Sequence, residues 1–321
     1  MKLLITGGAG FIGSHFVKRQ LDFPHWDMIT VLDSLTYAGN LSNLPDLKTN
    51  KRLRFVKGDI CNPTLVDELT NQVDIVVNFA AESHVDRSLL NSANFIQTNV
   101  AGTTNLLSNS LKNGVKIFHQ VSTDEVYGSI LSGSWDEEFP LKPNSPYAAS
   151  KASADLIALA YAHSFGMDVR ISRCSNNYGP NQHPEKLIPL AITNLIKEKK
   201  IPIYGDGLNR RDWLHVEDHC RAIELILEKG QAGHIYNVGG GFECTNLEIA
   251  AKISEIMGKG QSTIEFVEDR RGHDFRYSVN WTKLADETGY KPRNDFNNGL
   301  SRTVDWYRNN HEWWAPTVNQ K

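Results

Sequence analysis

A glycine-rich turn near the amino end constrains the fold of this chain more than any other feature. Gly8, Gly10 and Gly13 give the spacing G-x-G-x-x-G between a short apolar run over 3–5 and a helix-like stretch that ends near Leu21. In this spacing the first glycine allows a tight turn, the second lets the backbone approach a pyrophosphate, and the third lets helix and strand pack closely. The amides at the start of the helix then face the anion. The turn therefore predicts a phosphate-binding loop between a strand and a helix.

An acidic residue strengthens this interpretation. Val31, Leu32 and Asp33 end a second expected strand, and Asp33 lies about twenty residues past the glycines, where a carboxylate suits a ribose hydroxyl. The alternative is a glycine-rich turn with no ligand. The combined context predicts a bound dinucleotide.

Apolar runs and helix-like stretches alternate over the first half of the chain. Strands are expected over 53–56, 74–80, 116–122 and 168–174, and helices over 65–70, 94–111 and 150–165. This alternation predicts an α/β fold, a Rossmann-type doubly wound parallel sheet with helices on both faces. Ligands of such sheets bind beyond the carboxyl ends of the strands.

The pattern loosens after about residue 175. Segments 176–189 and 201–212 are rich in Gly, Pro, Asn and charges and are expected to be loops, while 218–229 and 246–257 have amphipathic helical spacing. We therefore predict a dinucleotide-binding Rossmann domain over 1–175, to which some later segments return, and a smaller α/β substrate-binding region mainly over 176–321. Trp306, Trp313 and Trp314 are interpreted as packing anchors rather than as a ligand-binding group.

Composition excludes several classes of partner. The net charge of −3 and the lack of a basic block argue against nucleic acid, and no apolar stretch approaches the length of a membrane span. No signal-peptide pattern opens the chain, and the four cysteines are scattered without a C-x-x-C pair. These features predict reduced thiols and a cytoplasmic protein. His215 and His219 have metal-ligand spacing, but no third ligand accompanies them, so packing or capping is favoured and no metal is expected.

Tyr147 and Lys151 are four positions apart at the start of an expected helix, so both side chains lie on one helical face. A nearby ammonium stabilises a phenolate, which predicts a lowered pKa for Tyr147 and a role as a base toward a hydroxyl. By itself this spacing is common and usually structural. A nucleotide fingerprint upstream favours the catalytic interpretation.

Thr123, Asp124 and Glu125 end the expected strand over 116–122. Adjacent carboxyls at this edge can divide labour, one protonated as an acid and the other ionised as a base. The alternative is an acidic first helical turn with a polar cap. Segment 80–88 offers small residues for a close backbone approach, or else a polar turn. Basic clusters at 210–211 and 270–271 suit phosphate oxygens as well as solvent.

Together these motifs resemble the extended short-chain dehydrogenase/reductase family, also known as the NAD-dependent epimerase/dehydratase family of nucleotide-sugar enzymes. Within it the chain is most similar to the dTDP-glucose 4,6-dehydratases. The resemblance covers nearly the whole chain, and its most specific parts are the Thr-Asp-Glu triplet at 123–125 and the run 185–189. Sugar 4-epimerases of similar fold usually lack the paired carboxyls.

The resemblance implies oxidation at C4 of the sugar, loss of water across C5 and C6, and reduction at C6, with no net consumption of NAD. Tyr147 would take the proton of the 4-hydroxyl, Lys151 would lower the tyrosine pKa and bind the nicotinamide ribose, and Thr123 would polarise the 4-oxygen. Glu125 would remove the C5 hydrogen, while Asp124 would protonate the departing hydroxyl.

The resemblance also implies two sets of binding residues. The NAD site would comprise Gly7, Gly8, Gly10, Phe11, Ile12, Gly13, Asp33, Ser34, Leu35, Thr36, Asp59, Ile60, Phe79, Ala80, Ala81, Ser83, Thr98, Tyr147, Lys151 and Asn177. The nucleoside-diphosphate hexose, dTDP-glucose in the first place, would contact Ser83, Thr123, Asn176, Glu185, Lys186, Leu187, Pro202, Ile203, Tyr204, Arg211, Asn246, Asp269, Arg270 and His273. Asp33 suits NAD over NADP, because a 2′-phosphate would meet its carboxylate.

Two other functions remain as alternatives, a nucleotide-sugar 4-epimerase and a non-catalytic NAD-binding sensor. The family commonly forms homodimers through two helices of each subunit. Segments 94–111 and 150–165 are the candidates for such helices, so the expected partners are the sugar nucleotide and a second copy of the chain.

Overall fold

The computed structural model describes residues 1–45, 47 and 49–318 of the chain. Its centre is a seven-stranded parallel sheet with the strand order β10-β6-β5-β4-β1-β2-β3. The strands are β1 (Lys2–Thr6), β2 (Met28–Asp33), β3 (Leu53–Lys57), β4 (Ile75–Asn78), β5 (Ile117–Thr123), β6 (Val169–Cys174) and β10 (Ile235–Val238). The expected doubly wound α/β fold is confirmed.

Helices cover both faces of this sheet because successive strand residues alternate between two cores. Leu3 and Ile5 face the core formed with α1 (Phe11–Leu21) and α8 (Val216–Lys229), whereas Leu4 faces the opposite core. Three helices close that second core, α2 (Pro63–Thr70), α5 (Thr103–Lys112) and α6 (Pro146–Phe165). This burial on both faces explains why the strands read as nearly continuous apolar runs.

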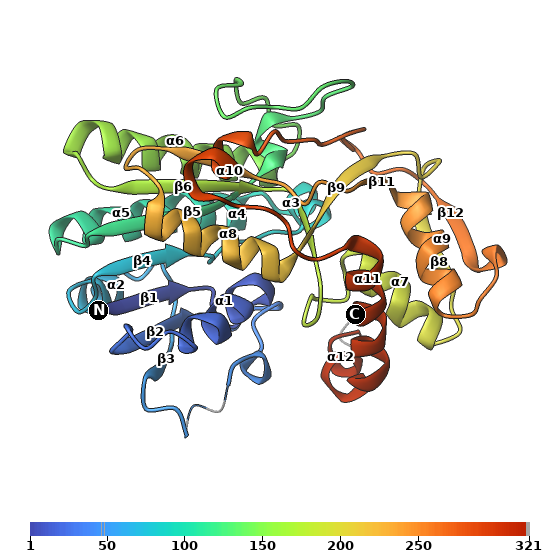
Figure 1. Ribbon diagram of the computed structural model, residues 1–321, viewed down its shortest axis with the longest axis horizontal. Helices are drawn as coiled ribbons and strands as arrows, with labels where there is room; N and C mark the ends of the chain where they lie inside the picture. The colour runs from blue at the N-terminus through green and yellow to red at the C-terminus, as the bar shows by residue number, and fades with distance from the viewer. Residues whose placement is uncertain (46, 48, 319–321) are drawn as a thin grey trace.

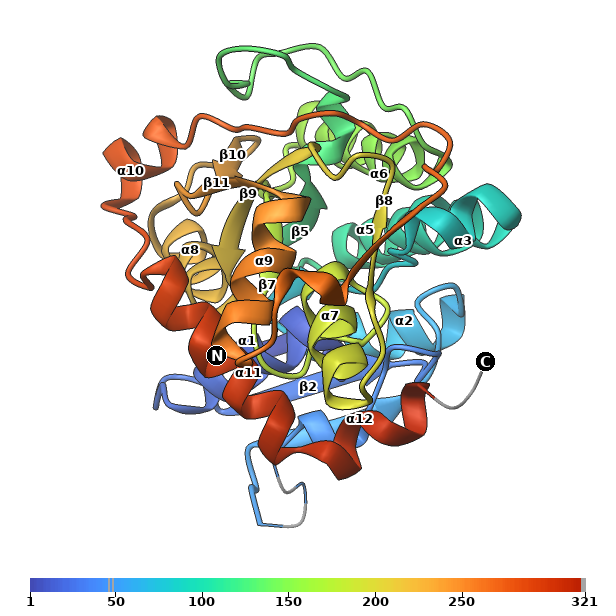
Figure 2. The ribbon, with the colours of Figure 1, turned by 90° about the vertical axis from the view of Figure 1, so that its right-hand side faces the viewer.

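A second group of elements forms the smaller part of the molecule, to the right of the sheet in Figure 1 and toward the viewer in Figure 2. A three-stranded sheet contains β7 (Asn176–Tyr178), β9 (Arg210–His215) and β11 (Glu243–Thr245), and β8 (Ile201–Tyr204) pairs with β12 (Ile264–Val267). The helices are α7 (Leu187–Ile196), α9 (Asn246–Ile256), α11 (Phe296–Asn309) and α12 (His311–Val318). Between β7 and α9 the chain returns to the large sheet as α8 and β10, and α10 (Thr282–Thr288) packs against both.

Two segments expected to be loops contain secondary structure. Segment 176–189 includes β7 and the start of α7, and segment 201–212 includes β8 and the start of β9. The loop prediction was wrong here because these strands are short and β7 and β9 are rich in polar residues. Their pairing partners, rather than local hydrophobicity, define them.

The helix expected over 94–111 is also interrupted. The chain forms α3 (Val85–Leu90), the short α4 (Ala93–Phe95), a π-helical segment η2 (Ile96–Gly102) and then α5. Within the π turn, the Asn99 amide accepts a hydrogen bond from Glu82 N and donates to Glu82 O and Ser150 Oγ. Such π turns are frequent at functional sites. Three 3₁₀ turns complete the described elements, η1 (Leu41–Asn43), η3 (Asp124–Tyr127) and η4 (Gln261–Thr263).

Tryptophans of the last two helices pack as anchors, as expected. Trp314 is fully buried in the core of the smaller region, and Trp306 and Trp313 pack beside it. The Trp313 Nε1 donates to Asn43 Oδ1 at 2.8 Å, and Asn43 Nδ2 donates to the Ala9 carbonyl at 2.9 Å. The end of the described chain therefore supports the glycine turn near its beginning.

Buried histidines predict a loss of stability in acid. Burial lowers the pKa of His119 and of His219 to about 3, so both stay neutral in the folded protein. The unfolded chain binds these protons near pH 6.5, so stability is full above that pH and falls as the pH drops toward the folded pKa. Each histidine contributes on the order of 1.4 kcal/mol per pH unit over this window. Urea unfolding at pH 7.5, 6 and 5 measures the slope, which His119→Gln should reduce; an unchanged slope would contradict the assignment.

Candidate active site

The glycine turn connects the end of β1 with the start of α1. Gly7 has a φ of 66°, and a Cβ atom on it would lie 2.6 Å from Ala80 N. A Cβ on Gly13 would lie 2.3 Å from Gly7 O. Both positions therefore require glycine, and the amides at the start of α1 face an open cavity. This backbone fits the pyrophosphate of a dinucleotide.

Asp33 is the last residue of β2, beside the glycine turn. Its carboxylate accepts hydrogen bonds from Ala9 N at 2.9 Å and Leu35 N at 2.8 Å. Burial raises the pKa of Asp33, and the two amides oppose that rise. The carboxylate is therefore fixed at the wall of the cavity, where it suits a ribose diol and repels a phosphate.

One continuous cavity runs from the glycine turn across the carboxyl ends of the central strands. Most of the residues expected to bind the dinucleotide or to carry the chemistry line it. They are Gly7, Gly10, Phe11, Ile12, Gly13, Asp33, Ser34, Thr36, Asp59, Ile60, Phe79, Ala80, Ala81, Ser83, Thr98, Thr123, Asp124, Glu125, Tyr147, Lys151, Asn176, Asn177, Glu185 and Lys186. Gly8 and Leu35 are not on this wall; a Cβ on Gly8 would instead meet the Val31 side chain at 2.7 Å.

The two adjacent carboxyls have different surroundings. Thr123 ends β5 and caps η3, accepting a hydrogen bond from Glu125 N at 3.3 Å. Asp124 is buried, and burial followed by repulsion from Glu125 raises its pKa well above its usual value. Burial also raises the pKa of Glu125, but the nearby cations of Arg270, Lys186 and Arg211 oppose it. This asymmetry favours a protonated Asp124 beside a more readily ionised Glu125.

Tyr147 lies in the first turn of α6, which Ser145 caps through a hydrogen bond from Ala148 N. Burial raises the pKa of Tyr147 well above its usual value, followed by repulsion from Glu125, while a hydrogen bond with Thr123 lowers it. The lowered pKa expected from the Tyr–Lys spacing is thus not observed. Lys151, one turn along the helix, donates from Nζ to Val121 O at 2.6 Å. Burial lowers the pKa of Lys151.

The remaining residues expected to contact the substrate lie outside the cavity wall, on the smaller region. Leu187, Pro202, Ile203, Tyr204, Arg211, Asn246, Asp269, Arg270 and His273 form this set. Arg270 and Arg211 nevertheless lie close enough to Glu125 to lower its pKa. Lys186 Nζ donates to Ser83 O at 2.9 Å, and Tyr204 OH donates to Asp86 at 3.1 Å. These contacts join the two halves of the molecule across the site.

Comparisons with known proteins agree with this geometry. The family described as GDP-mannose 4,6 dehydratase matches residues 4–303. The chain belongs to this dehydratase family. It is 52% identical over 98% of its length to a dTDP-glucose 4,6-dehydratase of Streptomyces antibioticus, 95% of which is covered, and 53% identical to one of Actinoplanes sp., with 98% and 100% covered.

A solved structure is similar over almost the whole fold. It is the dTDP-glucose 4,6-dehydratase DesIV of Streptomyces venezuelae with NAD and TYD bound, at a TM-score of 0.97 and 55% identity, with 99% of this chain and 100% of that chain covered. The resemblance to nucleotide-sugar dehydratases expected from the motifs is thus confirmed.

The cavity of this chain also involves residues that the sequence motifs did not single out as binding or catalytic. Ser122, Cys174, Gln182 and His183 line the cavity, and Asn99 lies behind it in the π turn. The position of Ser122 and Cys174 at the carboxyl ends of parallel strands was an available signal. No local pattern indicated the other three.

The histidine pair has structural partners. His215 accepts a hydrogen bond from Glu217 N and so caps α8, while His219 Nδ1 is 2.9 Å from Asn177 Oδ1. Packing and capping were the favoured interpretation for both. His219 thereby orients a residue of the cavity wall.

Gly13→Ala should weaken dinucleotide binding in this dehydratase. The added methyl group would overlap Gly7 O, so the turn must open, at a cost of about 1–3 kcal/mol. Calorimetric titration with NAD and a thermal melt measure the two effects. Gly260→Ala is the control, because its Cβ meets only Ser262 Oγ at 3.9 Å. Equal NAD affinity in wild type and Gly13→Ala would contradict the assigned loop.

Proposed function

We propose that this chain is a hydro-lyase that converts dTDP-glucose to dTDP-4-keto-6-deoxyglucose with NAD as its cofactor. The observation that carries the proposal is the meeting of two adjacent carboxyls, Asp124 and Glu125, with Tyr147 and Lys151 on the wall of one cavity that also contains the glycine turn. A simple oxidation or epimerisation has no use for paired carboxyls, whereas the loss of water requires a base and an acid. The relatives of similar length are named for the same reaction.

The glycine turn and Asp33 would hold NAD at the carboxyl ends of the neighbouring strands β1, β2 and β4. When bound, NAD removes two electrons from C4 of the sugar and returns them at C6. Asn176 Oδ1 is a buried polar atom without a hydrogen-bond partner among the described residues, and Asn176 lines the cavity. Such atoms support a polar ligand in this space.

Tyr147 would accept the proton of the sugar 4-hydroxyl at its phenolic oxygen. Thr123 supports this role because its hydroxyl bonds the phenol and so fixes the direction of the proton transfer. Lys151 lies one helical turn away and is itself buried, so its ammonium would stabilise the phenolate that accepts this proton and becomes a phenol.

Glu125 would remove the proton at C5 and return it there when C6 is reduced, and Asp124 would donate a proton to the 6-hydroxyl, which departs as water. Cations around Glu125 favour its carboxylate, and burial beside Glu125 keeps Asp124 protonated. Burial raises the pKa of both carboxyls, and the cations that oppose this rise at Glu125 suit its role as the base. Asp124 is itself buried, which limits the exchange of its proton with solvent.

Lys186, Arg211 and Arg270 would neutralise the diphosphate of the substrate. Burial lowers the pKa of Lys186 and that of Arg211. The nearby carboxylates therefore do not fully compensate for the burial of these two cations. The Nε atom of Arg270 is buried and unpartnered among the described residues. A diphosphate would supply the missing charge and acceptors.

The two alternatives are less well supported. A 4-epimerase leaves Asp124 and Glu125 without a task, and a non-catalytic sensor leaves Tyr147 and Lys151 without one as well. The two relatives that are 52% and 53% identical to this chain are named as dehydratases, whereas a UDP-glucuronic acid 4-epimerase of similar fold is 28% identical.

Incubation of the NAD-loaded protein with dTDP-glucose tests the proposal. The expected product has lost one water and absorbs in alkaline solution as a keto sugar. UDP-glucose and UDP-N-acetylglucosamine serve as comparison substrates. An epimer of unchanged mass would establish the first alternative, and recovery of unreacted sugar from all three substrates would overturn the enzymatic assignment.

We further propose that two copies associate through η2 and α6. Ile96, Leu156 and Phe165 are 52%, 57% and 60% exposed on these elements, which supports a covered apolar face. Leu156→Glu should produce a monomer in light scattering.

The free state of all four cysteines supports action in the reducing cytoplasm. Among the described residues, no helix combines the length and apolarity needed to cross a membrane.

A further inference from the structure

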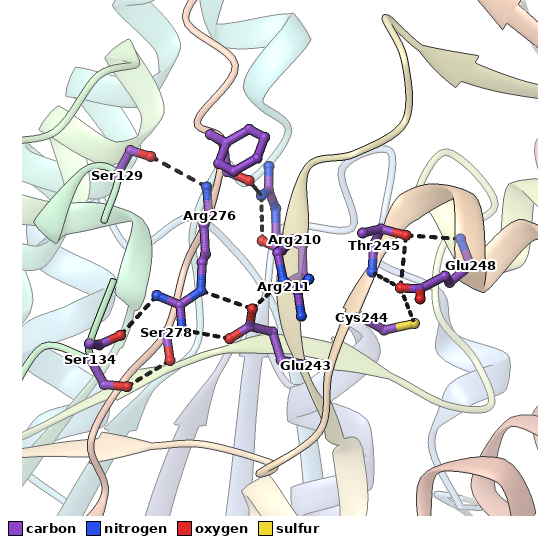
Figure 3. Close-up of polar contacts among 12 residues, drawn as sticks. Ser129, Ser134, Arg210, Arg211, Glu243, Cys244, Thr245, Glu248, Arg276 and Ser278 are labelled. Atoms are coloured by element: carbon purple, nitrogen blue, oxygen red, sulfur yellow. Dashed lines mark hydrogen bonds and ion pairs between the residues drawn. The ribbon is translucent and has the colours of Figure 1, made fainter. Parts of the chain in front are cut away.

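We propose that Glu243 is a positioning residue for the nucleotide end of the substrate. Its carboxylate joins Arg210 on β9 to Arg276 on a strap formed by residues 269–279 (Figure 3). We call Glu243, Arg210 and Arg276 the clasp. The proposal rests on the proposed function, because it assigns the clasp to the binding of that substrate.

The clasp ties together three segments that are distant in sequence. Arg276 donates from Nε to Glu243 Oε1 at 2.8 Å and from Nη2 to Oε2 at 2.7 Å, while Arg210 Nε donates to Oε1. Arg276 also donates from Nη1 to Gly133 O at 2.8 Å, in the loop that follows the catalytic turn η3. Ser134 and Ser278 reinforce that junction through their hydroxyls, 2.8 Å apart.

The clasp controls the register between β9 and the strap. Arg210 N donates to Phe275 O at 2.7 Å, and Tyr277 N donates to Arg210 O at 3.2 Å. Successive residues of a strand point to opposite faces, so Arg210 faces the clasp while Arg211 faces the site. Arg211 is buried and donates to Asp274 O at 2.8 Å. A shift of the strap along β9 would therefore move Asp274 O, which accepts the hydrogen bond from Arg211, and so change the orientation of the Arg211 side chain.

The strap carries other groups that we assign to the substrate. Arg270 and His273 lie upstream of Arg276, and His273 Nδ1 is 2.7 Å from Asp269 Oδ1. The Tyr277 hydroxyl donates to Asp274 Oδ2 at 2.6 Å and so braces the bend between them. The clasp fixes the downstream end of this segment.

The other end of β11 leads to a further substrate residue. Thr245 caps α9 in a reciprocal arrangement with Glu248, visible on the right of Figure 3, and Asn246 is the first residue of that helix. Asn246 N also donates to Asn209 O at 3.0 Å, next to Arg210. Glu243 thus connects, through short rigid segments, to Arg211, Asn246 and the strap.

The clasp itself acts from outside the site. Of the residues described as lining the cavity, none belongs to the clasp. Partial burial raises the pKa of Glu243, but hydrogen bonds from Arg276 and Arg210 hold it below its usual value, so the carboxylate is ionised at neutral pH. Glu243→Gln removes the charge and one acceptor while keeping the shape of the side chain.

Steady-state kinetics with dTDP-glucose and calorimetry with dTDP and with NAD test the assignment. For Glu243→Gln we expect KM and the dissociation constant of dTDP to rise about tenfold. The values of kcat and of the NAD dissociation constant should stay within about twofold, because Glu243 contacts none of the residues assigned to the cofactor or to the chemistry. Glu243→Gln and Arg276→Gln combined should raise KM less than the product of the single effects, since both break one contact.

Asp168→Asn is the matched control. Asp168 accepts two hydrogen bonds from Arg170, at 2.9 and 2.7 Å, just before the start of β6 and outside the cavity lining. It should lower the melting temperature without raising KM. If Glu243→Gln fails to fold, Arg276→Lys provides the same test, because it keeps the charge and loses the paired geometry.

The outcomes separate this proposal from the proposed function. A wild type that neither converts dTDP-glucose nor binds dTDP overturns the function. A wild type that does both, with Glu243→Gln changing the melting temperature but leaving KM and dTDP affinity unchanged, overturns the positioning role alone.

Discussion

Tyr147→Phe is expected to reduce kcat for dTDP-glucose by about three orders of magnitude. The substitution removes only the phenolic oxygen, the atom assigned to accept the proton of the 4-hydroxyl. The affinity for NAD should hold, because the glycine turn and Asp33 are unchanged and the ring of Phe fills the same space beside Phe95. Turnover followed by mass spectrometry and NAD binding by calorimetry measure the two effects separately.

Tyr236→Phe is the matched control for this change. Its hydroxyl donates to Glu287 at 2.6 Å on β10, outside the described cavity, so activity should stay near that of the wild type. Retention of normal turnover by Tyr147→Phe would contradict the assignment of Tyr147 as the base.

Asp124→Asn is expected to lower kcat by about two orders of magnitude with little change in KM. The amide cannot donate the acidic proton that the departing 6-hydroxyl needs. In the wild type the rate should fall as pH rises through the raised pKa of Asp124, because only the protonated form is active. The variant should lose this alkaline decline, so rate profiles between pH 6 and 9 provide the measurement.

The same variant should be more stable than the wild type. Because the folded-state pKa of Asp124 lies above its ordinary value of 3.8, ionisation favours the unfolded chain, and stability falls as pH rises from that value to the folded pKa. The asparagine lacks this penalty, so its advantage in urea unfolding should grow with pH over the window and then level off. A conserved rate together with an unchanged stability would contradict the assignment of Asp124 as a buried acid.

Asp305→Asn provides the control for both measurements. Its carboxylate is exposed and pairs with Arg308 at 3.7 Å, so neither the rate profile nor the pH dependence of stability should change. Tyr147→Phe and Asp124→Asn together test whether removal of the 4-hydroxyl proton and loss of water use different residues.

The sequence was sufficient to predict the large sheet and its helices, because strands buried on both faces produce long apolar runs that need no tertiary information. It was also sufficient for the glycine turn, where a Cβ would overlap Gly7 O or Ala80 N. The comparisons confirm NAD as the cofactor of the structural relatives and the dehydratase relationship. The individual roles of Tyr147 and the two carboxyls stay predictions.

The sequence was insufficient where long-range contacts define the structure. β7 consists of two asparagines and a tyrosine, and only pairing with β9 makes it a strand. The π turn at Asn99 depends on partners at Glu82 and Ser150 that no local pattern reveals. The spacing of Tyr147 and Lys151 does not reveal whether the tyrosine is exposed to solvent. Burial raises the pKa of Tyr147, which is opposite to the direction expected from the spacing.

The hydrogen bond from Trp313 to Asn43 has a consequence for synthesis of the protein. The two residues are 270 positions apart, so the ribosome must translate nearly the whole described chain before the glycine turn gains this support. Because Asn43 also binds the Ala9 carbonyl in the turn, a chain truncated before Trp313 should release NAD faster than the chain of residues 1–321.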